Sequence, residues 1–166
     1  MKNINFTLLF LFITIFNSCS SKLTTKQLTS QLGVNANIDK NIYYWSSGQD
    51  LQGEGFEISV YSLKLKTGDI VNSNYPLVDL NKKDWNISTW EKTPVSLNDF
   101  DILLEYNVKN EKVRKYILDI ENTLKQDGNF YCYYYHFAKN TNIIIGIDLY
   151  VIDSREKIFY NSEINI

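Results

Sequence analysis

The feature that most restricts the fold of this 166-residue chain is a nearly continuous apolar stretch close to its C-terminus. Residues 143–152 read IIIGIDLYVI. Because alternate side chains of a strand point to opposite faces, this run predicts a central strand that is covered on both faces. Residues 129–138 and 158–160 are also strand-like, and turn-forming residues separate the three segments. The sequence therefore predicts a three-stranded antiparallel meander.

A second strand-forming region lies earlier in the chain. Aromatic and β-branched residues fill positions 42–45, and residues 56–65 alternate between apolar and polar side chains. The apolar positions change phase between Val60 and Tyr61. A change of phase within one strand predicts a β-bulge, which inserts a residue and redirects the side chains.

The helical pattern is strongest over residues 110–128. Five apolar side chains in this segment fall on one stripe of a helix. Asn110 stands where an N-cap is expected, and Gly128 stands where the helix should end. The stripe consists of Val113, Tyr116, Ile117, Ile120 and Leu124.

A shorter helix is predicted over residues 97–106, because Ser96 and Asp99 have the spacing of a capping box. A strand over residues 101–106 is the alternative. Strands grouped around one or two helices, without regular alternation, predict an α+β fold. We expect one globular domain over residues 40–166, with an antiparallel sheet, one main amphipathic helix and the C-terminal meander.

The N-terminus has the organisation of an export signal. Lys2 gives it a positive charge, and residues 6–16 form an apolar run of 11 residues. A helix that spans a bilayer needs about 20 apolar residues, so a run this short indicates the hydrophobic region of a signal peptide. Small and polar residues follow at positions 17–21, as cleavage by a signal peptidase requires.

Residues 16–19 (FNSC) resemble the lipobox of bacterial lipoprotein precursors. The resemblance implies that the Cys19 thiol receives a diacylglyceryl group, that cleavage removes residues 1–18, and that the new N-terminus is acylated. Several acyl chains hold a protein on a membrane far more firmly than one. With Ser20 after the cysteine, the resemblance implies an outer-membrane location facing the periplasm.

Residues 19–39 have a composition rich in Ser, Thr, Asn and Lys. We predict that this segment is the lipidated cysteine followed by a flexible tether that lifts the domain off the bilayer. Leu23, Leu28 and Leu32, followed by Gly33, leave a short helix as the alternative.

Removal of residues 1–18, which contain one lysine and no acid, leaves 148 residues and changes the net charge from −2 to −3. This mildly acidic balance argues against a nucleic-acid partner, whose phosphates need a basic surface. With Cys19 acylated, Cys132 is the only thiol left, so no intrachain disulfide is expected. The fold must therefore depend on its apolar core.

Cys132, Tyr134 and His136 share one face of a predicted strand. A thiol and an imidazole on one face suggest a nucleophile and its base, but four residues of strand separate the two groups by about 13 Å. This distance excludes a Cys132–His136 dyad and favours a buried structural cysteine. Asp148 interrupts the apolar run, and we interpret it as a paired or exposed carboxylate rather than a functional one.

The sequence contains no motif for a metal, a cofactor or a known catalytic group. One histidine is too few for a typical catalytic zinc site. The phosphate-binding loops, the EF-hand loop and the nucleophile elbow are all absent. We therefore predict no catalytic residues, no metal ligands and no cofactor.

Two functional hypotheses follow from the remaining residues. The first is a non-enzymatic binding or accessory module that engages a protein or a glycan of the cell envelope. Its binding surface would be the sheet or the long loop over residues 72–94, through Trp85 and Trp90. The alternative is an envelope-directed hydrolase that uses carboxylates. The candidate carboxylates are Glu54, Glu57 and Asp148.

Overall fold

The computed structural model describes residues 23–48, 54–75, 85–139 and 141–166 of the chain. The strands in these segments are β1 (Ala36–Ser46), β2 (Gly55–Leu65), β3 (Trp85–Ile87), β4 (Glu91–Lys92), β5 (Phe130–Phe137), β6 (Ile144–Asp153) and β7 (Ile158–Asn165). The apolar run at residues 6–16 and the cysteine at position 19 lie outside the described residues.

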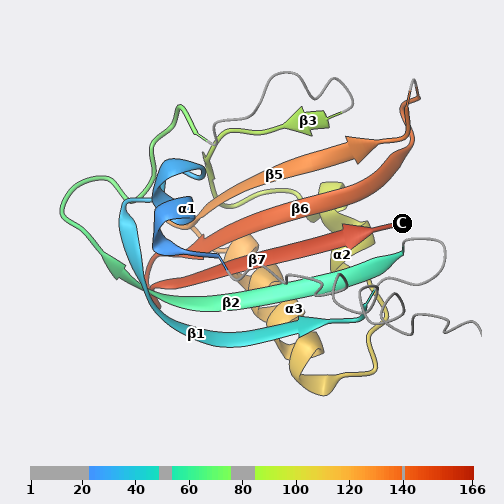
Figure 1. Cartoon of the computed structure of the whole chain (residues 1–166), viewed down its shortest axis with the longest axis horizontal. Helices are drawn as coiled ribbons and strands as arrows, with labels where there is room; N and C mark the ends of the chain where they lie inside the picture. The colour runs from blue at the N-terminus through green and yellow to red at the C-terminus, as the bar shows by residue number, and fades with distance from the viewer. Residues whose placement is uncertain (1–22, 49–53, 76–84, 140) are drawn as a thin grey trace, which may run out of the picture.

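The strands form one antiparallel sheet with the order β1-β2-β7-β6-β5-β3, and β4 also pairs with β5 (Figure 1). β5, β6 and β7 pair in the order in which they occur in the chain, as the turn signals predict. The predicted antiparallel sheet is confirmed. The described chain is mostly β, and it contains one helix of seven or more residues.

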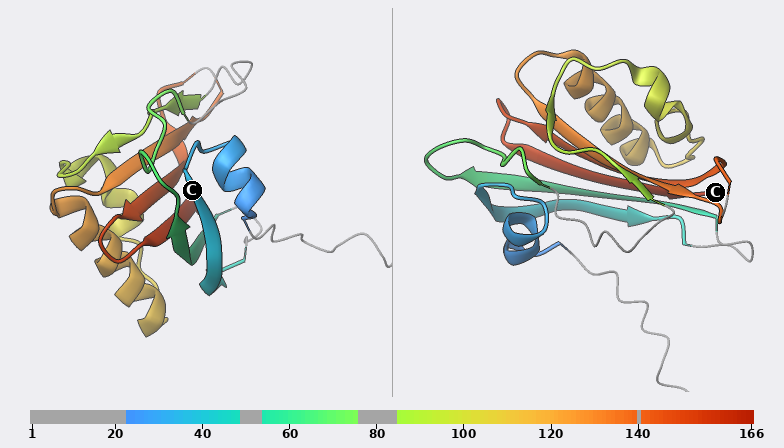
Figure 2. Two further views of the ribbon diagram at one scale, coloured as in Figure 1. Left: turned by 90° about the vertical axis from the view of Figure 1, so that its left-hand side faces the viewer. Right: turned by 90° about the horizontal axis from the view of Figure 1, so that it is seen from above.

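Helices lie on both faces of this sheet (Figure 2). They are α1 (Thr25–Ser30), the 3-10 helix η2 (Leu97–Phe100), α2 (Asp101–Leu104) and α3 (Glu111–Lys125). α2 and α3 cover one face, and α1 lies on the opposite face at the end where β2 finishes. Among the described residues, no helix has both the length and the apolar character needed to cross a bilayer.

Each covered face has its own apolar cluster. The cluster beneath α3, called the α3 face, includes Phe56, Ile58, Val60, Ile147, Leu149 and Val151. The cluster beneath α1, called the α1 face, includes Leu28, Tyr61, Leu63, Cys132, Ile152 and Phe159. The fold is therefore a sheet between two apolar layers, and the layer under α1 occupies only one end of its face.

The phase change in β2 has a different cause from the predicted bulge. β2 pairs with β7 in unbroken register from Gly55 to Ser62, so β2 itself holds no extra residue there. Val60 belongs to the α3 face, whereas Tyr61 belongs to the α1 face. The apolar pattern changes phase because the burial of β2 passes from one face to the other. The register shifts lie in the neighbouring β1, beside Asp39 and Ile42.

The amphipathic helix matches its sequence pattern. The Asn110 side chain accepts hydrogen bonds from the backbone N–H groups of Lys112 and Val113, which caps α3 as predicted. Four residues of the stripe are buried and Tyr116 is half-buried against the same cluster. Gly128 adopts a φ of +87° just beyond the helix, a conformation that glycine accepts without strain.

The second helical segment forms, but without the predicted capping box. η2 and α2 follow each other over residues 97–104, so the strand alternative for residues 101–106 is wrong. Ser96 is the N-cap of η2, yet its side chain makes no capping hydrogen bond. Burial of Phe100 and Leu103 against α3 and the sheet stabilises this segment instead.

Most of the predicted tether is folded. Thr24 and Gln27 form a capping box at the start of α1, and Leu28 is fully buried. Gly33, with a φ of +67°, ends this segment, and β1 begins at Ala36. The short-helix alternative is therefore the one that the structure bears out for this segment. Composition misled the prediction because the three leucines, rather than the polar majority, decide whether such a segment packs.

The prediction that residues 143–152 form a strand covered on both faces holds only for the second half of β6. Ile147, Leu149 and Val151 pack on the α3 face, and Ile152 packs on the α1 face. Ile145, at the other end of the strand, remains 40% exposed. The difference arises because α1 and its neighbouring loop reach only the far end of the strand.

We expect Leu28→Ala to lower the free energy of unfolding by about 2–5 kcal/mol, because it removes a fully buried side chain and leaves a cavity. Urea denaturation of the full-length chain measures this change. The matched control is Thr29→Ala, at the exposed neighbouring position of α1, which should change stability by about 0.5 kcal/mol or less. Equal stability of the two variants would mean that α1 contributes nothing to the core.

Candidate functional site

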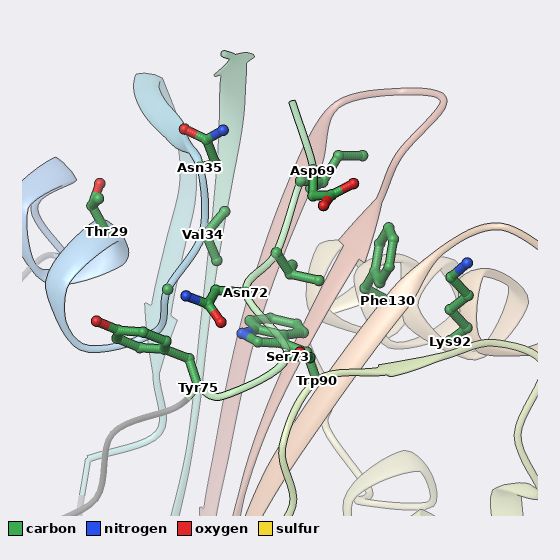
Figure 3. Close-up of a pocket in the computed structure, with 13 residues that line it drawn as sticks. Thr29, Val34, Asn35, Asp69, Asn72, Ser73, Tyr75, Trp90, Lys92 and Phe130 are labelled. Atoms are coloured by element: carbon green, nitrogen blue, oxygen red, sulfur yellow. The ribbon is translucent and has the colours of Figure 1, made fainter. Parts of the chain in front are cut away.

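A cavity of about 730 Å³ lies beside α1, on the α1 face of the sheet (Figure 3). Its size is within the range of small-molecule binding sites, about 300–1,000 Å³. The cavity is lined by Thr29, Gly33, Val34, Asn35, Asp69, Ile70, Val71, Asn72, Ser73, Tyr75, Trp90, Lys92 and Phe130. These residues come from α1, the turn before β1, the loop after β2, β4 and β5.

Backbone hydrogen bonds hold two walls of the cavity together. The N–H of Asn35 donates to the carbonyl of Ile70, and the N–H of Asn72 donates to the carbonyl of Gly33. Gly33 is required at its position, since its φ is +67° and a Cβ there would collide with the ring of Tyr75. The loop after β2 is therefore fixed against the turn that leaves α1.

Trp90 lines the cavity and connects its walls. Its side chain is only 6% exposed, and its indole N–H donates to the carbonyl oxygen of Leu32. Its backbone N–H donates to the carbonyl of Tyr75. Trp90 thus ties the start of β4 to both walls, and it offers the cavity a small part of its ring rather than an open aromatic surface.

Trp85 and Trp90 lie next to different parts of β5. Trp85 pairs through its backbone with His136, whereas β4, which follows Trp90, pairs with Tyr131 and Phe130. Five residues of β5 separate the two pairing points, which is about 16 Å along a strand. The side chain of Trp85 lies outside the described part of the structure.

The cavity combines aromatic surface with short polar side chains. Its aromatic residues are Tyr75, Trp90 and Phe130, and its polar side chains come from Thr29, Asn35, Asp69, Asn72, Ser73 and Lys92. In Figure 3, Asp69 comes from the loop after β2 and Lys92 from β4, with the ring of Phe130 between them. Aromatic faces accept apolar ring faces, while amide and hydroxyl groups hydrogen-bond to hydroxyl groups. Such a lining suits a polar, hydroxyl-rich ligand of low charge.

The sequence pattern identified Trp90 but not most of the other lining residues. Asp69 stood in a turn signal, and Tyr75 stood in a region with no regular period. These residues come together only because the loop after β2 packs on the segment that leaves α1. No spacing in the sequence reports that contact.

The acidic residues gather elsewhere, in a row across the other end of the α1 face. Glu57 on β2 is directly opposite Glu163 on β7, and Glu163 is directly opposite Asp148 on β6. Residues that face each other in this way have Cβ atoms about 5 Å apart. The Tyr44 hydroxyl donates to the Glu57 carboxylate over 3.0 Å, and the Asn165 amide donates to the Glu163 carboxylate over 3.0 Å.

The surroundings of Glu163 disfavour its charged form. Burial raises its pKa above the usual value, and the neighbouring charges of Asp148 and Glu57 raise it further. The hydrogen bond from Asn165 and the proximity of His136 oppose this shift. Sequence analysis did not identify Glu163. The alternation of side chains along a strand places it on the same face as Phe159 and Asn161.

Asp148 and His136 lie close together. The Nε2 atom of His136 is 3.5 Å from an Oδ atom of Asp148, and both side chains are largely buried. Asp148 thus lies next to an imidazole on the α1 face. Its other oxygen, Oδ1, is buried without a hydrogen-bond partner.

Cys132 and His136 do not form a nucleophile–base pair, as strand geometry predicts. Cys132 is fully buried, and burial raises the pKa of its thiol, which disfavours the reactive thiolate. Cys132 is opposite Tyr150, whereas His136 is opposite Gly146, four residues further along the strand pair. Cys132 therefore acts as a small apolar side chain of the core.

The cavity next to the acidic row is small. Glu57 and Asp148 are separated by one strand, which puts them about 10 Å apart, just beyond the separation of about 6.5–9.5 Å in inverting glycosidases. The cavity that Glu57 and Glu163 line is only about 50 Å³, too small for a sugar ring. Glu54 is exposed just before β2. The described residues contain no group of three or more His, Cys, Asp or Glu side chains arranged to hold a metal ion.

No protein-family model matches this chain, and no curated protein or solved structure matches it either.

We expect Glu163→Gln to raise the free energy of unfolding at pH 7 by about 1 kcal/mol or less, because it removes a charge that faces two other acids. A carboxyl group whose pKa is raised by folding stabilises the fold below its ordinary pKa of 4.5, and this stabilisation is lost as the pH rises through the raised value. The variant should therefore lose less stability than the wild type between pH 4.5 and pH 7. Chemical denaturation at several pH values measures this slope.

The matched control is Glu156→Gln, which removes an exposed acid from the turn between β6 and β7. Its pH slope should equal that of the wild type. If Glu163→Gln and Glu156→Gln give the same slope, the acidic row does not control the pH dependence.

Proposed function

We propose that this chain is a lipid-anchored protein of the cell envelope whose domain is a non-enzymatic binding module. The cavity beside α1 is the binding site, and its ligand is a hydroxyl-rich molecule such as an envelope glycan. The observation that carries the proposal is the lining of the 730 Å³ cavity by aromatic and hydrogen-bonding side chains, with one acid and one base among them. We place the protein on the outer membrane, facing the periplasm.

The export signal and residues 16–19 support the anchor. The apolar run at residues 6–16 is too short to span a bilayer and has the length of a signal-peptide core. Acylation at Cys19 would supply more than one chain, and two membrane signals are what stable anchoring requires.

The character of the cavity supports a glycan over an ionic ligand. One acid and one base, Asp69 and Lys92, balance each other among the lining residues. Asn35 and Asn72 add amide groups, and Trp90 adds part of an aromatic face. Sugar rings present both hydroxyl groups and apolar C–H faces, so this mixture complements them.

We prefer a binding module to a carboxylate hydrolase because of the space available at the two sites. The cavity of about 730 Å³ lies away from the acidic row, whereas the cavity that Glu57 and Glu163 line is about 50 Å³. A hydrolase would need its acids to line a cleft that holds the substrate.

We expect the full-length chain in detergent to bind one or more soluble fragments of envelope glycans, and Asp69→Ala to weaken binding about tenfold or more. A hydrogen bond to a charged group contributes about 1.5–3 kcal/mol. Ser73→Trp, which fills the cavity from an exposed position, should abolish binding. Ligand-observed NMR over a panel of muropeptides and lipopolysaccharide oligosaccharides measures the affinities.

The matched control for Asp69→Ala is Asp127→Ala, an exposed acid after α3 that should leave the affinity unchanged. Wild-type affinity in both Asp69→Ala and Ser73→Trp would place the site elsewhere. A wild-type chain that binds no member of the panel would refute the glycan proposal.

The anchor has its own test. Cells that express the chain and take up labelled palmitate should yield labelled protein, and Cys19→Ala should yield none, because the thiol is the first acylation site that the lipobox resemblance implies. Globomycin, which blocks cleavage of lipoprotein precursors, should make the precursor accumulate. If the wild type carries no label, the chain is not a lipoprotein.

A further inference from the structure

The folded domain begins very close to the proposed anchor. The backbone N–H of Leu23 donates to the hydroxyl of Tyr61 over 3.1 Å, and the capping box of α1 starts at Thr24. Tyr61 is buried in the centre of β2. The chain is therefore attached to the sheet from Leu23 onward, and the long flexible spacer that the composition predicts does not separate the domain from Cys19.

This attachment limits the distance between the domain and a bilayer. Leu23 is the fourth residue after Cys19, and a fully extended chain covers about 3.3–3.6 Å per residue. If Cys19 is acylated, its backbone lies at the membrane interface, and Leu23 lies within about 14 Å of it. Since α1 starts directly after Leu23, the side of the molecule that carries α1 must be the side nearest the membrane (Figure 2).

The distribution of charge favours the same orientation. Between Cys19 and Asp39 the chain has two lysines, Lys22 and Lys26, and no acid. Residues 39–166 have 14 basic and 19 acidic residues, a net charge of −5. Asp39 itself forms an ion pair with Lys64 at 2.6 Å. Anionic lipid headgroups attract lysines next to an anchor and repel the acidic remainder of the domain.

We infer that the domain rests on the bilayer with its α1 side against anionic lipid headgroups, so that the mouth of the cavity lies beside the membrane surface. This inference rests on the proposed lipid anchor. The exposed side chains of α1 that would face the headgroups are Thr24, Lys26, Thr29 and Ser30. Thr29 also lines the cavity, and at 1.5 Å per helical residue it is about 9 Å from Leu23.

The opposite side of the molecule provides the comparison. Asn122 is exposed on α3, which packs on the other face of the sheet. A sheet and a helix layer pack about 10 Å apart, so a probe at Asn122 should lie about 20 Å farther from the bilayer than one at Ser30. Native cysteines do not interfere, because Cys132 is fully buried and acylation would block the Cys19 sulfur.

The experiment uses the acylated full-length chain in vesicles of phosphatidylethanolamine and phosphatidylglycerol that contain a lipid with a nitroxide headgroup. A fluorophore is attached to Ser30→Cys or, in a separate sample, to Asn122→Cys. We expect quenching by the nitroxide to be about threefold stronger or more at residue 30, given the difference in depth of about 20 Å. Circular dichroism of each labelled variant verifies the fold.

A spacer variant shows whether the short connection causes the orientation. Ten Gly and Ser residues inserted between Ser21 and Lys22 give a connection of about 14 residues, whose root-mean-square length is about 20 Å. In this variant the quenching at residues 30 and 122 should become similar. Retention of the full difference would overturn the role of the short connection.

The remaining outcomes separate this inference from the anchor. Equal quenching at residues 30 and 122 in the native-length chain, with the protein retained on the vesicles, overturns the orientation but leaves the anchor in place. If the protein does not stay on the vesicles and the fluorophore also reacts with Cys19, acylation has not occurred. That result overturns the anchor and the orientation together.

Discussion

The rest of the structure depends on the burial of β2 on both of its faces. Its first half packs Phe56, Ile58 and Val60 under α3, and its second half packs Tyr61 and Leu63 under α1. β2 also pairs with β1 on one side and β7 on the other. A single strand therefore links both apolar layers, which lets the described chain hold two clusters together without a disulfide.

The two halves of the α1 face have different properties because α1 covers only one of them. Under and beside α1, apolar residues and the loop after β2 enclose the large cavity. At the other end of this face, polar and acidic side chains of β2, β7 and β6 occupy the positions that α1 does not cover. The raised pKa of Glu163 is the electrostatic consequence of placing three acids in direct register there.

Several parts of this organisation were predictable from local pattern. The stripe of α3 and its Asn110 cap depend on residues within one helix, so their spacing contains the needed information. The separation of Cys132 from His136 likewise follows from the geometry of one strand. The bulge assigned to β2 was wrong because the apolar pattern reports burial, and burial of β2 depends on elements far away in the chain.

The cavity and the packing of Leu28 on the sheet could not be predicted from local pattern. Asp69, Trp90 and Phe130 are far apart in sequence and meet only after β2, β4 and β5 have paired. Leu28 reads as part of a polar segment until its contact with the sheet is known.

The sequence by itself determined most of the strands and the main helix, since each depends on residue type and short-range spacing. Only the tertiary structure decided that Leu23 is hydrogen-bonded to the sheet, that Glu57, Glu163 and Asp148 share a row, and that a cavity forms beside α1. The physical reason is that strand order and the placement of helices on a sheet bring together residues with no common spacing along the chain.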